Sequence, residues 1–288
     1  MNSIPVLGVI GGSGLYEFPA LQKVEMYNPE TPFGFPSAPI VIGTLNDKRV
    51  AFLARHGIGH TFSPTEVNYR ANIYALKMLG INRVVGVSAC GSLREDFAPG
   101  NIVIPDQLFD HTHRRERSFF GDGLVVHVSV AEPFCPDLST ALFQAVSGCG
   151  CVVHKGGAMI TIEGPRFSTK AESNIYRAWG LSLIGMTTSP EAFLAREAEM
   201  CYAVMAHVTD YDVWHQTEEV VSVDLVIKTL LQNTEVAQKS IQHLVDQLPD
   251  CSACNCANAL ATAVITNRNA ASESTVKRLN HLLKKYIQ

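Results

Sequence analysis

The stretch RVAFLARHGIGHTFSPTEVNYRANIYALKMLGINRVVGVS, residues 49–88, indicates the fold. Two short runs rich in β-branched and apolar residues, 49–54 and 83–88, are typical of buried strands. Between them the sequence places apolar residues at helical spacing and then a glycine, at Val67, Ala71, Tyr74, Ala75, Met78 and Gly80. A helix that crosses over from one strand to the next predicts an α/β fold.

The rest of the chain continues this alternation. Ser189, Pro190 and Glu191 are typical of an N-cap, a first-turn proline and a first-turn acid, and they predict a helix over 191–199. Residues 221–248 and 274–287 predict a long amphipathic helix and a shorter one that ends in cations. The further strand candidates are 6–10, 40–45, 101–105, 158–162, 183–186 and 202–208.

Composition excludes several classes of protein. The 288 residues, 47% hydrophobic and 17% charged, suffice for one large core, and we expect one domain. The formal net charge of −4 lacks the basic balance of nucleic-acid-binding proteins, so nucleic acid is not an expected partner. No segment approaches the roughly 18 uninterrupted apolar residues of a membrane span, and the N-terminus lacks the basic segment of a signal peptide. We expect a cytoplasmic protein without membrane contact.

The eight cysteines are spread along a chain with no export signal, and most are expected to be core thiols. Cys251, Cys254 and Cys256 form the exception, because they crowd into six residues. A zinc site is one interpretation of this cluster. Only one C-x-x-C is present and no second pair follows it, so no metal is expected and a cluster of surface thiols is favoured.

A glycine-rich turn follows the first predicted strand at Gly11, Gly12, Ser13 and Gly14. Such a turn exposes backbone N–H groups and a hydroxyl, which suit an anion. It fails as a dinucleotide fingerprint because Glu17 stands where the third glycine belongs, and no Gly-Lys pair makes it a P-loop. Taken alone, an ordinary tight turn is the favoured interpretation.

Two more predicted strands end in groups that suit a phosphate. Arg55 and His56 follow the strand at 49–54, and an arginine presents a planar fork of donors. Ser88 and Ala89 end the strand at 83–88. A surface pair and an ordinary turn explain each motif alone. Because ligands gather at the carboxyl ends of strands in α/β sheets, the three strand ends together predict an oxyanion site.

The strand at 202–208 leads into two acids, Asp210 and Asp212. Since two anions repel, these carboxylates are expected to face an uncharged or cationic part of the same ligand, and an amino-purine fits. A turn with an aspartate cap explains the pair equally well on the sequence alone.

At this point several motifs in one order carry a resemblance. They are GVIGGSGLY (8–16), ARHGIGH (54–60), VNYRANI (67–73), SACGSLRED (88–96), AEPFC (131–135), TIEGPRFST (161–169), AES (171–173), MTTSPE (186–191) and TDYD (209–212). Through them the chain resembles the trimeric purine nucleoside phosphorylase family, and in particular its members that act on methylthioadenosine. The resemblance implies one domain with a central mixed, partly barrel-like β-sheet flanked by helices. Residues 1–249 would form the catalytic part, and 250–288 a cysteine-containing tail and helix of the same domain.

The resemblance also implies roles for individual residues. Asp210 would bind N7 and the 6-amino group of adenine, with help from Asp212, and both would be catalytic. His127 would reach a neighbouring subunit's site, which implies a homotrimer, with a dimer of trimers as the alternative assembly. The implied phosphate ligands are Ser13, Arg55, His56, Ser88, Ala89 and Thr187. The implied contacts to the nucleoside are Met186 at the ribose, and Phe167, Ser168 and Tyr211 near the base and sugar. Val223, Val226 and Ile227 would surround the methylthio group.

The implied activity is that of a pentosyltransferase: phosphorolysis of S-methyl-5′-thioadenosine to adenine and 5-methylthioribose 1-phosphate. Inorganic phosphate is a co-substrate, and neither a cofactor nor a metal is implied. The alternative is a phosphorylase for adenosine, inosine or methylthioinosine. Enzymes for 6-oxopurines carry asparagine at the base-reading position, where this chain has Asp210. A hydrolytic nucleosidase and a non-catalytic dinucleotide-binding module are further hypotheses.

Further structural expectations complete the resemblance. Glu163 is expected to order its loop through hydrogen bonds, and the histidine- and arginine-rich segment 110–120 to form a polar lid or an intersubunit contact. The tail resembles a cysteine-rich tail of archaeal relatives, which implies a disulfide among Cys251, Cys254 and Cys256 and a weaker hypothesis of a Cys135–Cys201 bridge.

Overall fold

The computed structural model describes residues 3–12, 18–215, 223–250 and 254–286, and for residues 223–233 and Arg268 it describes the backbone only. The strands are β1 (Leu7–Gly11), β2 (Gln22–Tyr27), β3 (Ile40–Leu45), β4 (Lys48–Ala54), β5 (Arg83–Ser92), β6 (Ile102–Ile104), β7 (Gln107–His111), β8 (Val153–Lys155), β9 (Ala158–Ile162), β10 (Leu183–Gly185) and β11 (Cys201–Asp210). The α-helices are α1 (Tyr69–Met78), α2 (Pro136–Ser147), α3 (Lys170–Ala178), α4 (Thr188–Glu197), α5 (Val223–Asp246), α6 (Glu273–Arg278) and α7 (Asn280–Leu283), and two 3₁₀ turns are η1 (Asn255–Asn258) and η2 (Arg268–Ala270).

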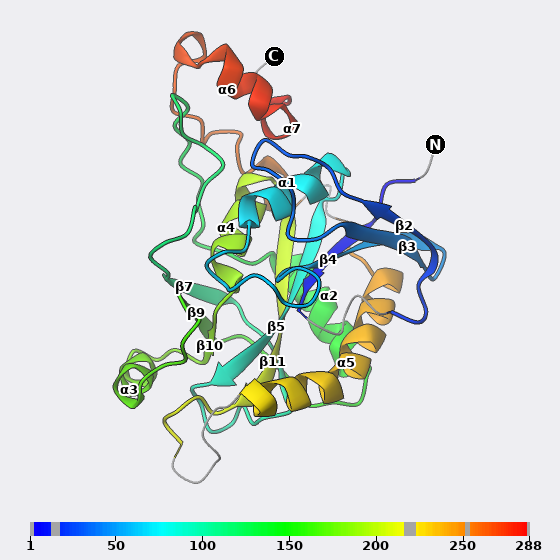
Figure 1. The fold of residues 1–288 in the computed structure, drawn as a ribbon, viewed down its shortest axis with the longest axis vertical. Coiled ribbons are helices and arrows are strands. Elements are labelled where there is room, and N and C mark those ends of the chain that lie inside the picture. The colour runs from blue at the N-terminus through cyan, green and yellow to red at the C-terminus, as the bar shows by residue number, and fades with distance from the viewer. Residues whose placement is uncertain (1–2, 13–17, 216–222, 251–253, 287–288) are drawn as a thin grey trace.

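The described strands form one mixed sheet of eleven strands that branches at β5 (Figure 1). Eight strands are hydrogen-bonded neighbours in the order β2-β3-β4-β1-β5-β10-β9-β7. The strand β11 lies outside this order and pairs in parallel with β5 and antiparallel with β6. β1 and β4 also run parallel to each other and to β5. The carboxyl ends of β1, β4, β5 and β11 therefore meet at the same edge, and the prediction of an α/β protein with a mixed sheet is confirmed.

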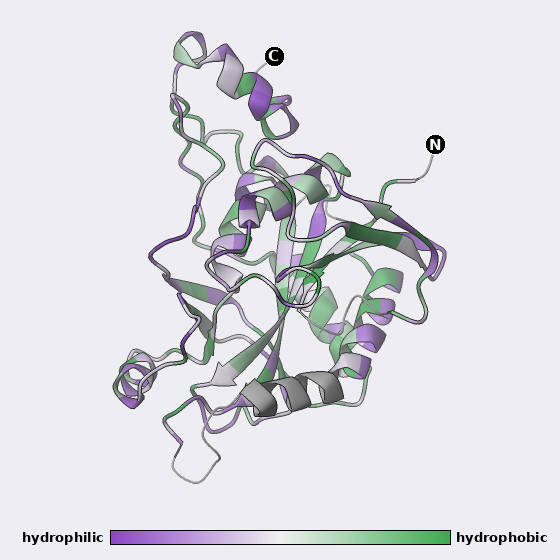
Figure 2. Ribbon diagram, viewed as in Figure 1, coloured by the Kyte–Doolittle hydropathy of each residue, from purple (hydrophilic) through white to green (hydrophobic). Residues whose placement is uncertain are grey.

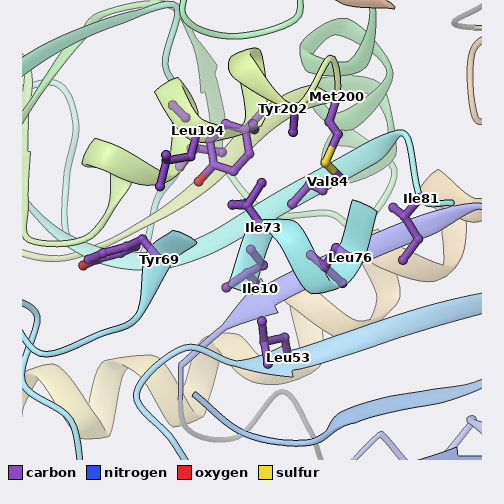
Figure 3. Close-up of a cluster of buried hydrophobic side chains, with 14 of the residues drawn as sticks. Ile10, Leu53, Tyr69, Ile73, Leu76, Ile81, Val84, Leu194, Met200 and Tyr202 are labelled. Atoms are coloured by element: carbon purple, nitrogen blue, oxygen red, sulfur yellow. The ribbon is translucent and has the colours of Figure 1, made fainter. Parts of the chain in front are cut away.

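The predicted crossover helix is α1, between β4 and β5. The Asn68 side chain caps it by accepting a hydrogen bond from the Ala71 N–H at 3.2 Å, and Gly80, at φ +79°, follows the helix. Ile73 and Leu76 are buried as fully as Ala71, so the helix buries more than the one predicted face. Figure 3 shows Ile73 and Leu76 among side chains from the sheet and from α4.

Two hydrophobic cores lie on opposite faces of the sheet, because successive residues of a strand point to opposite sides. Along β11, Tyr202, Val204 and Ala206 pack with residues of α1 and α4, whereas Ala203 and Met205 pack with residues of α2 and α5. Figure 2 shows the hydrophobic colours gathered on the central strands and on the helices beside them. A strand buried on both faces explains why 202–208 is a continuous apolar run.

The last predicted helix is interrupted. Residues 274–287 were expected to form one helix, but the structure ends α6 at Arg278 and begins α7 at Asn280. Leu279 between them, at φ −98° and ψ 18°, leaves the helical conformation and is fully buried. The break allows Leu279, Leu282 and Leu283 all to enter the core beside α1.

The C-terminal segment, residues 254–286, pairs with the long loop 112–135 between β7 and α2 (Figure 1). The His127 N–H donates to the Ala263 carbonyl at 2.9 Å, next to a bridge between Val126 and Val264. Farther along, the Asp122 carboxylate forms an ion pair with Arg278 at 2.7 Å. Among the described residues, no helix is long and apolar enough to cross a membrane.

Candidate active site

The strand ends bring polar groups together at one edge of the sheet. Gly11, the last residue of β1, lies beside Ala54 of β4, and its carbonyl accepts the Arg55 N–H at 2.9 Å. Ser88 lies on the neighbouring strand β5, and its Oγ is 3.3 Å from the Oγ1 of Thr187, the residue immediately before α4. Ser88 and Thr187 are 99 residues apart in sequence and both are buried. The half-buried Ala89 follows Ser88, whereas Ser13 lies outside the described residues.

The Arg55 guanidinium is fully enclosed and bound to protein acceptors. Its Nε and Nη2 donate to the two carboxylate oxygens of Glu191 at 2.8 and 2.9 Å. Nη1 and Nη2 also donate to the carbonyls of Val87 and Ile10, at 3.0 and 3.1 Å. These bonds use four of the five guanidinium N–H groups. The sequence suggested that the Arg55 fork of donors binds a phosphate, but in the structure this fork donates to Glu191. One N–H group of Arg55 is left for another acceptor.

Sequence reasoning missed this role of Glu191. The residue was interpreted as an acid in the first turn of a helix, and its side chain is completely buried. In addition to Arg55, the Tyr202 hydroxyl donates to it at 2.6 Å. Burial lowers the pKa of Arg55, but the Glu191 carboxylate more than offsets this effect and raises it, so Arg55 stays charged.

His56 is uncharged at neutral pH. Burial and the nearby charge of Arg55 lower its pKa to about 4. Its Nδ1 lies 2.9 Å from the Phe62 carbonyl, and because a carbonyl only accepts, Nδ1 carries the proton. Nε2 is then a lone-pair acceptor. The ring stacks on His60 with centroids 4.3 Å apart.

Asp210 and Asp212 lie buried at the end of β11. Asp210 accepts hydrogen bonds from the Thr209 hydroxyl at 2.6 Å and from the Asp212 N–H at 2.7 Å. Burial raises the pKa of Asp210, and the Asp212 charge raises it further. Asp210 pairs with Gly91 of β5, where an added Cβ would lie 2.9 Å from the Asp210 carboxylate, so Gly91 leaves room for this side chain.

Asp212 meets the hydroxyls of Ser168 and Ser173. Burial raises the pKa of Asp212, and these hydroxyls oppose the shift. Nevertheless the Oδ2 of Asp212 and both serine Oγ atoms are buried without a well-formed hydrogen bond to any described residue. Buried polar atoms normally have partners, so this group is suited to receive a polar ligand.

Met186 and the loop 163–169 lie next to these groups. Gly164 has φ +69°, and an added Cβ there would lie 2.7 Å from the Met186 sulfur, so only glycine fits. Met186 is half-buried and Phe167 is 38% exposed. The Tyr211 hydroxyl, outside this group, donates to the Glu95 carbonyl at 3.1 Å.

Glu163 orders this loop, as expected from the sequence. Its carboxylate accepts hydrogen bonds from the Thr65 hydroxyl and from the N–H groups of His113 and Arg114. Burial raises the pKa of Glu163, but these bonds outweigh it and lower the pKa to about 2. Arg115, missed by sequence reasoning, is buried and donates to the carbonyls of Glu163 and Ser189, at 2.7 and 2.6 Å. The segment 113–115 is therefore fixed to both β9 and α4.

The resemblance also implied roles for His127, Val223, Val226 and Ile227. His127 is exposed on the long loop 112–135. The side chains of Val223, Val226 and Ile227, on α5, lie outside the described residues.

Comparisons with known proteins cover nearly the whole chain. A family model described as the phosphorylase superfamily matches residues 6–248. S-methyl-5′-thioadenosine phosphorylase of Geobacter sulfurreducens is 51% identical over 98% of this chain and 99% of its own, and that of Hyperthermus butylicus is 49% identical over 90% and 95%. Among solved structures, a methylthioadenosine phosphorylase from an antarctic soil metagenomic library has a TM-score of 0.93 at 46% identity, covering 98% of this chain and 100% of its own. Methylthioadenosine phosphorylase from Schistosoma mansoni, in complex with adenine, has a TM-score of 0.85 at 37% identity, covering 93% and 99%.

Proposed function

The chain belongs to the phosphorylase superfamily, and on that basis we propose that it cleaves S-methyl-5′-thioadenosine with inorganic phosphate. The products are adenine and 5-methylthioribose 1-phosphate, so the protein is a pentosyltransferase. The observation that supports the proposal is that one strand, β5, contributes to two different subsites, one for phosphate and one for the purine. Ser88, which meets Thr187, and Gly91, which faces Asp210, are three residues apart on β5, or about 10 Å. A ribose fits between a phosphate at the first subsite and a purine at the second.

Asp210 acts on the purine. The leaving adenine gains negative charge as its bond to C1′ breaks, and a proton delivered to N7 neutralises that charge. Only a protonated carboxyl can donate this proton, and burial together with Asp212 raises the pKa of Asp210 in the required direction. Asp212 and Ser168 supply further polar atoms beside the base and sugar.

Phosphate is held mainly by neutral donors. Arg55 is paired with Glu191, and His56 is uncharged, so neither cancels the charge of a bound phosphate. The hydroxyls of Ser88 and Thr187 and the remaining N–H of Arg55 bind and orient it. A phosphate that keeps its negative charge stabilises the positive charge that develops at C1′ and then attacks that carbon. His56, with a lone pair on Nε2, accepts a hydrogen bond from the P–O–H group of a hydrogen phosphate.

A homotrimer in the cytoplasm is also part of the proposal. It rests on the sequence resemblance and on the exposure of His127 on the long loop 112–135, where a neighbouring subunit can be reached. Neither a metal nor an organic cofactor has a step in this scheme.

The test is to incubate the protein with methylthioadenosine, with and without phosphate, and to measure adenine and sugar phosphate. The proposal expects adenine only when phosphate is present, with one sugar phosphate formed for each adenine. Equal release of adenine without phosphate would identify a nucleosidase. Faster cleavage of inosine than of methylthioadenosine would favour the alternative, a 6-oxopurine phosphorylase.

A further inference from the structure

Four cysteines from three separate parts of the chain meet in the core, away from the candidate active site. Cys135 precedes α2, Cys201 begins β11, and Cys254 and Cys256 lie at the start of η1 in the C-terminal segment. All four are buried, and their Sγ atoms lie within 4.8 Å of one another. This group is here called the four-cysteine cluster.

The spacing of the sulfurs suits a tetrahedral metal ion. With metal–sulfur bonds of about 2.3 Å, four sulfurs around zinc lie about 3.8 Å from one another. The Sγ atoms of Cys135 and Cys254 are 3.5 Å apart, and every other pair falls within 4.8 Å. A disulfide joins two sulfurs at about 2.05 Å and would divide the cluster into pairs. No disulfide joins any of the described cysteines, including the hypothesised pairs Cys254–Cys256 and Cys135–Cys201.

A buried cation stands beside the cluster. Four thiolates around a divalent ion carry a net charge of −2, which is costly to bury without compensation. The Nη1 of Arg196 donates to the Cys256 sulfur at 3.2 Å, and this arginine is buried. Its other terminal nitrogen donates to the Glu132 carbonyl, which holds the guanidinium in place. Hydrogen bonds of this kind to ligand sulfurs are a regular part of thiolate metal sites.

We propose that Cys135, Cys201, Cys254 and Cys256 bind one zinc ion. Thiolate sulfur selects soft or borderline ions, and a set of four thiolates in tetrahedral reach is typical of zinc. Because the protein fills all four coordination positions, the site is structural and leaves no position for a substrate. The ion fixes the C-terminal segment to α2 and β11. The sequence argued against zinc because it contains no second C-x-x-C, but the fold supplies Cys135 and Cys201 in place of that pair.

Metal analysis of the purified wild-type protein is the first test. We expect about one zinc per chain after dialysis, and eight free thiols when the protein is denatured with a chelator and without reductant. Addition of Co²⁺ to reduced, metal-free protein should give the visible bands of tetrahedral cobalt thiolate. Protein without metal and with fewer than eight thiols would indicate disulfides and overturn the proposal, as would reduced protein that gives no cobalt bands.

Matched variants locate the site. Cys254→Ala and Cys256→Ala should each lose zinc to a chelator at least tenfold faster than wild type. Cys90→Ala is the control, because Cys90 is equally buried but its thiol faces the His207 carbonyl outside the cluster. Equal loss from Cys90→Ala and Cys256→Ala would contradict the assignment. If both cluster variants fail to fold, the cobalt titration of the wild type still decides, and none of these readouts depends on enzyme activity.

Discussion

The buried Arg55–Glu191 ion pair makes Glu191→Gln the most informative single substitution. Glutamine keeps the shape of the side chain but has no charge, and its NH₂ group is a donor where Glu191 accepts from Arg55 and Tyr202. Both Glu191 oxygens accept from Arg55, so one Arg55 donor loses its acceptor whichever way the amide is oriented. The arginine cannot release its proton, so its charge stays buried and unpaired.

The expected loss of stability in Glu191→Gln follows from the burial of the Arg55 and Glu191 side chains, which are 2% and 0% exposed. Two charges about 4 Å apart attract by roughly 4 kcal/mol at an effective dielectric constant near 20. Removing one partner of a buried pair costs about 3–5 kcal/mol. Since each kcal/mol lowers the melting temperature of a protein of this size by about 2–4 °C, we expect a drop on the order of 10 °C.

The assay is thermal denaturation of four proteins: wild type, Glu191→Gln, the exposed control Glu235→Gln, and the double variant Arg55→Met/Glu191→Leu. The control, which removes only an exposed pair with Lys239, should change the melting temperature little. The double variant should melt higher than Glu191→Gln, because it leaves no unpaired charge. A Glu191→Gln protein within two or three degrees of wild type, or a double variant less stable than Glu191→Gln, would refute the reasoning.

Four predictions concern catalysis and are tested by steady-state kinetics. Asp210→Asn should lower kcat by about 10²- to 10⁴-fold, because an amide cannot transfer the proton. In the wild type, kcat should fall as the pH rises through the raised pKa of Asp210, and Asp212→Asn, by removing a negative charge, should move this fall to lower pH. Gly91→Ala should lower kcat about tenfold to a hundredfold with little change in the KM for phosphate, because the new Cβ meets the Asp210 carboxylate. Ser88→Ala and Thr187→Ala should each raise the KM for phosphate about tenfold, through loss of a hydrogen bond to a charged group, and an unchanged KM would remove these residues from the phosphate site.

The buried strands could be predicted because burial leaves apolar runs in the sequence. All eight strand candidates correspond to strands of the structure. Three strands, β2, β7 and β8, were missed. The strand β2, QKVEMY, is exposed along nearly its whole length and is held by its ladder with β3 at the edge of the sheet. Its side chains carry no burial pattern, so no periodicity marks it. The break at Leu279 was missed for a related reason, since α7 is positioned by packing against α1.

The site was predictable where local sequence places a side chain at a strand end. Ser88 and Asp210 follow from this rule, because the ends of parallel strands meet at one edge of the sheet. The partner of Arg55 was not predictable, since Glu191 lies 136 residues away and only the closed fold brings the two together. The same holds for the four-cysteine cluster, whose Cys135 and Cys254 are 119 residues apart.

The pairing of the C-terminal segment with the long loop 112–135 has a practical consequence for handling the protein. The loop contacts Ala263, Val264 and Arg278, so its shape depends on residues that lie far beyond it in the sequence. A shortened C-terminus would loosen His127 and Asp122, and it would also remove Leu279, Leu282 and Leu283 from the core beside α1. Affinity tags therefore belong at the N-terminus, and preparations with a clipped C-terminus should be separated before activity and assembly are compared.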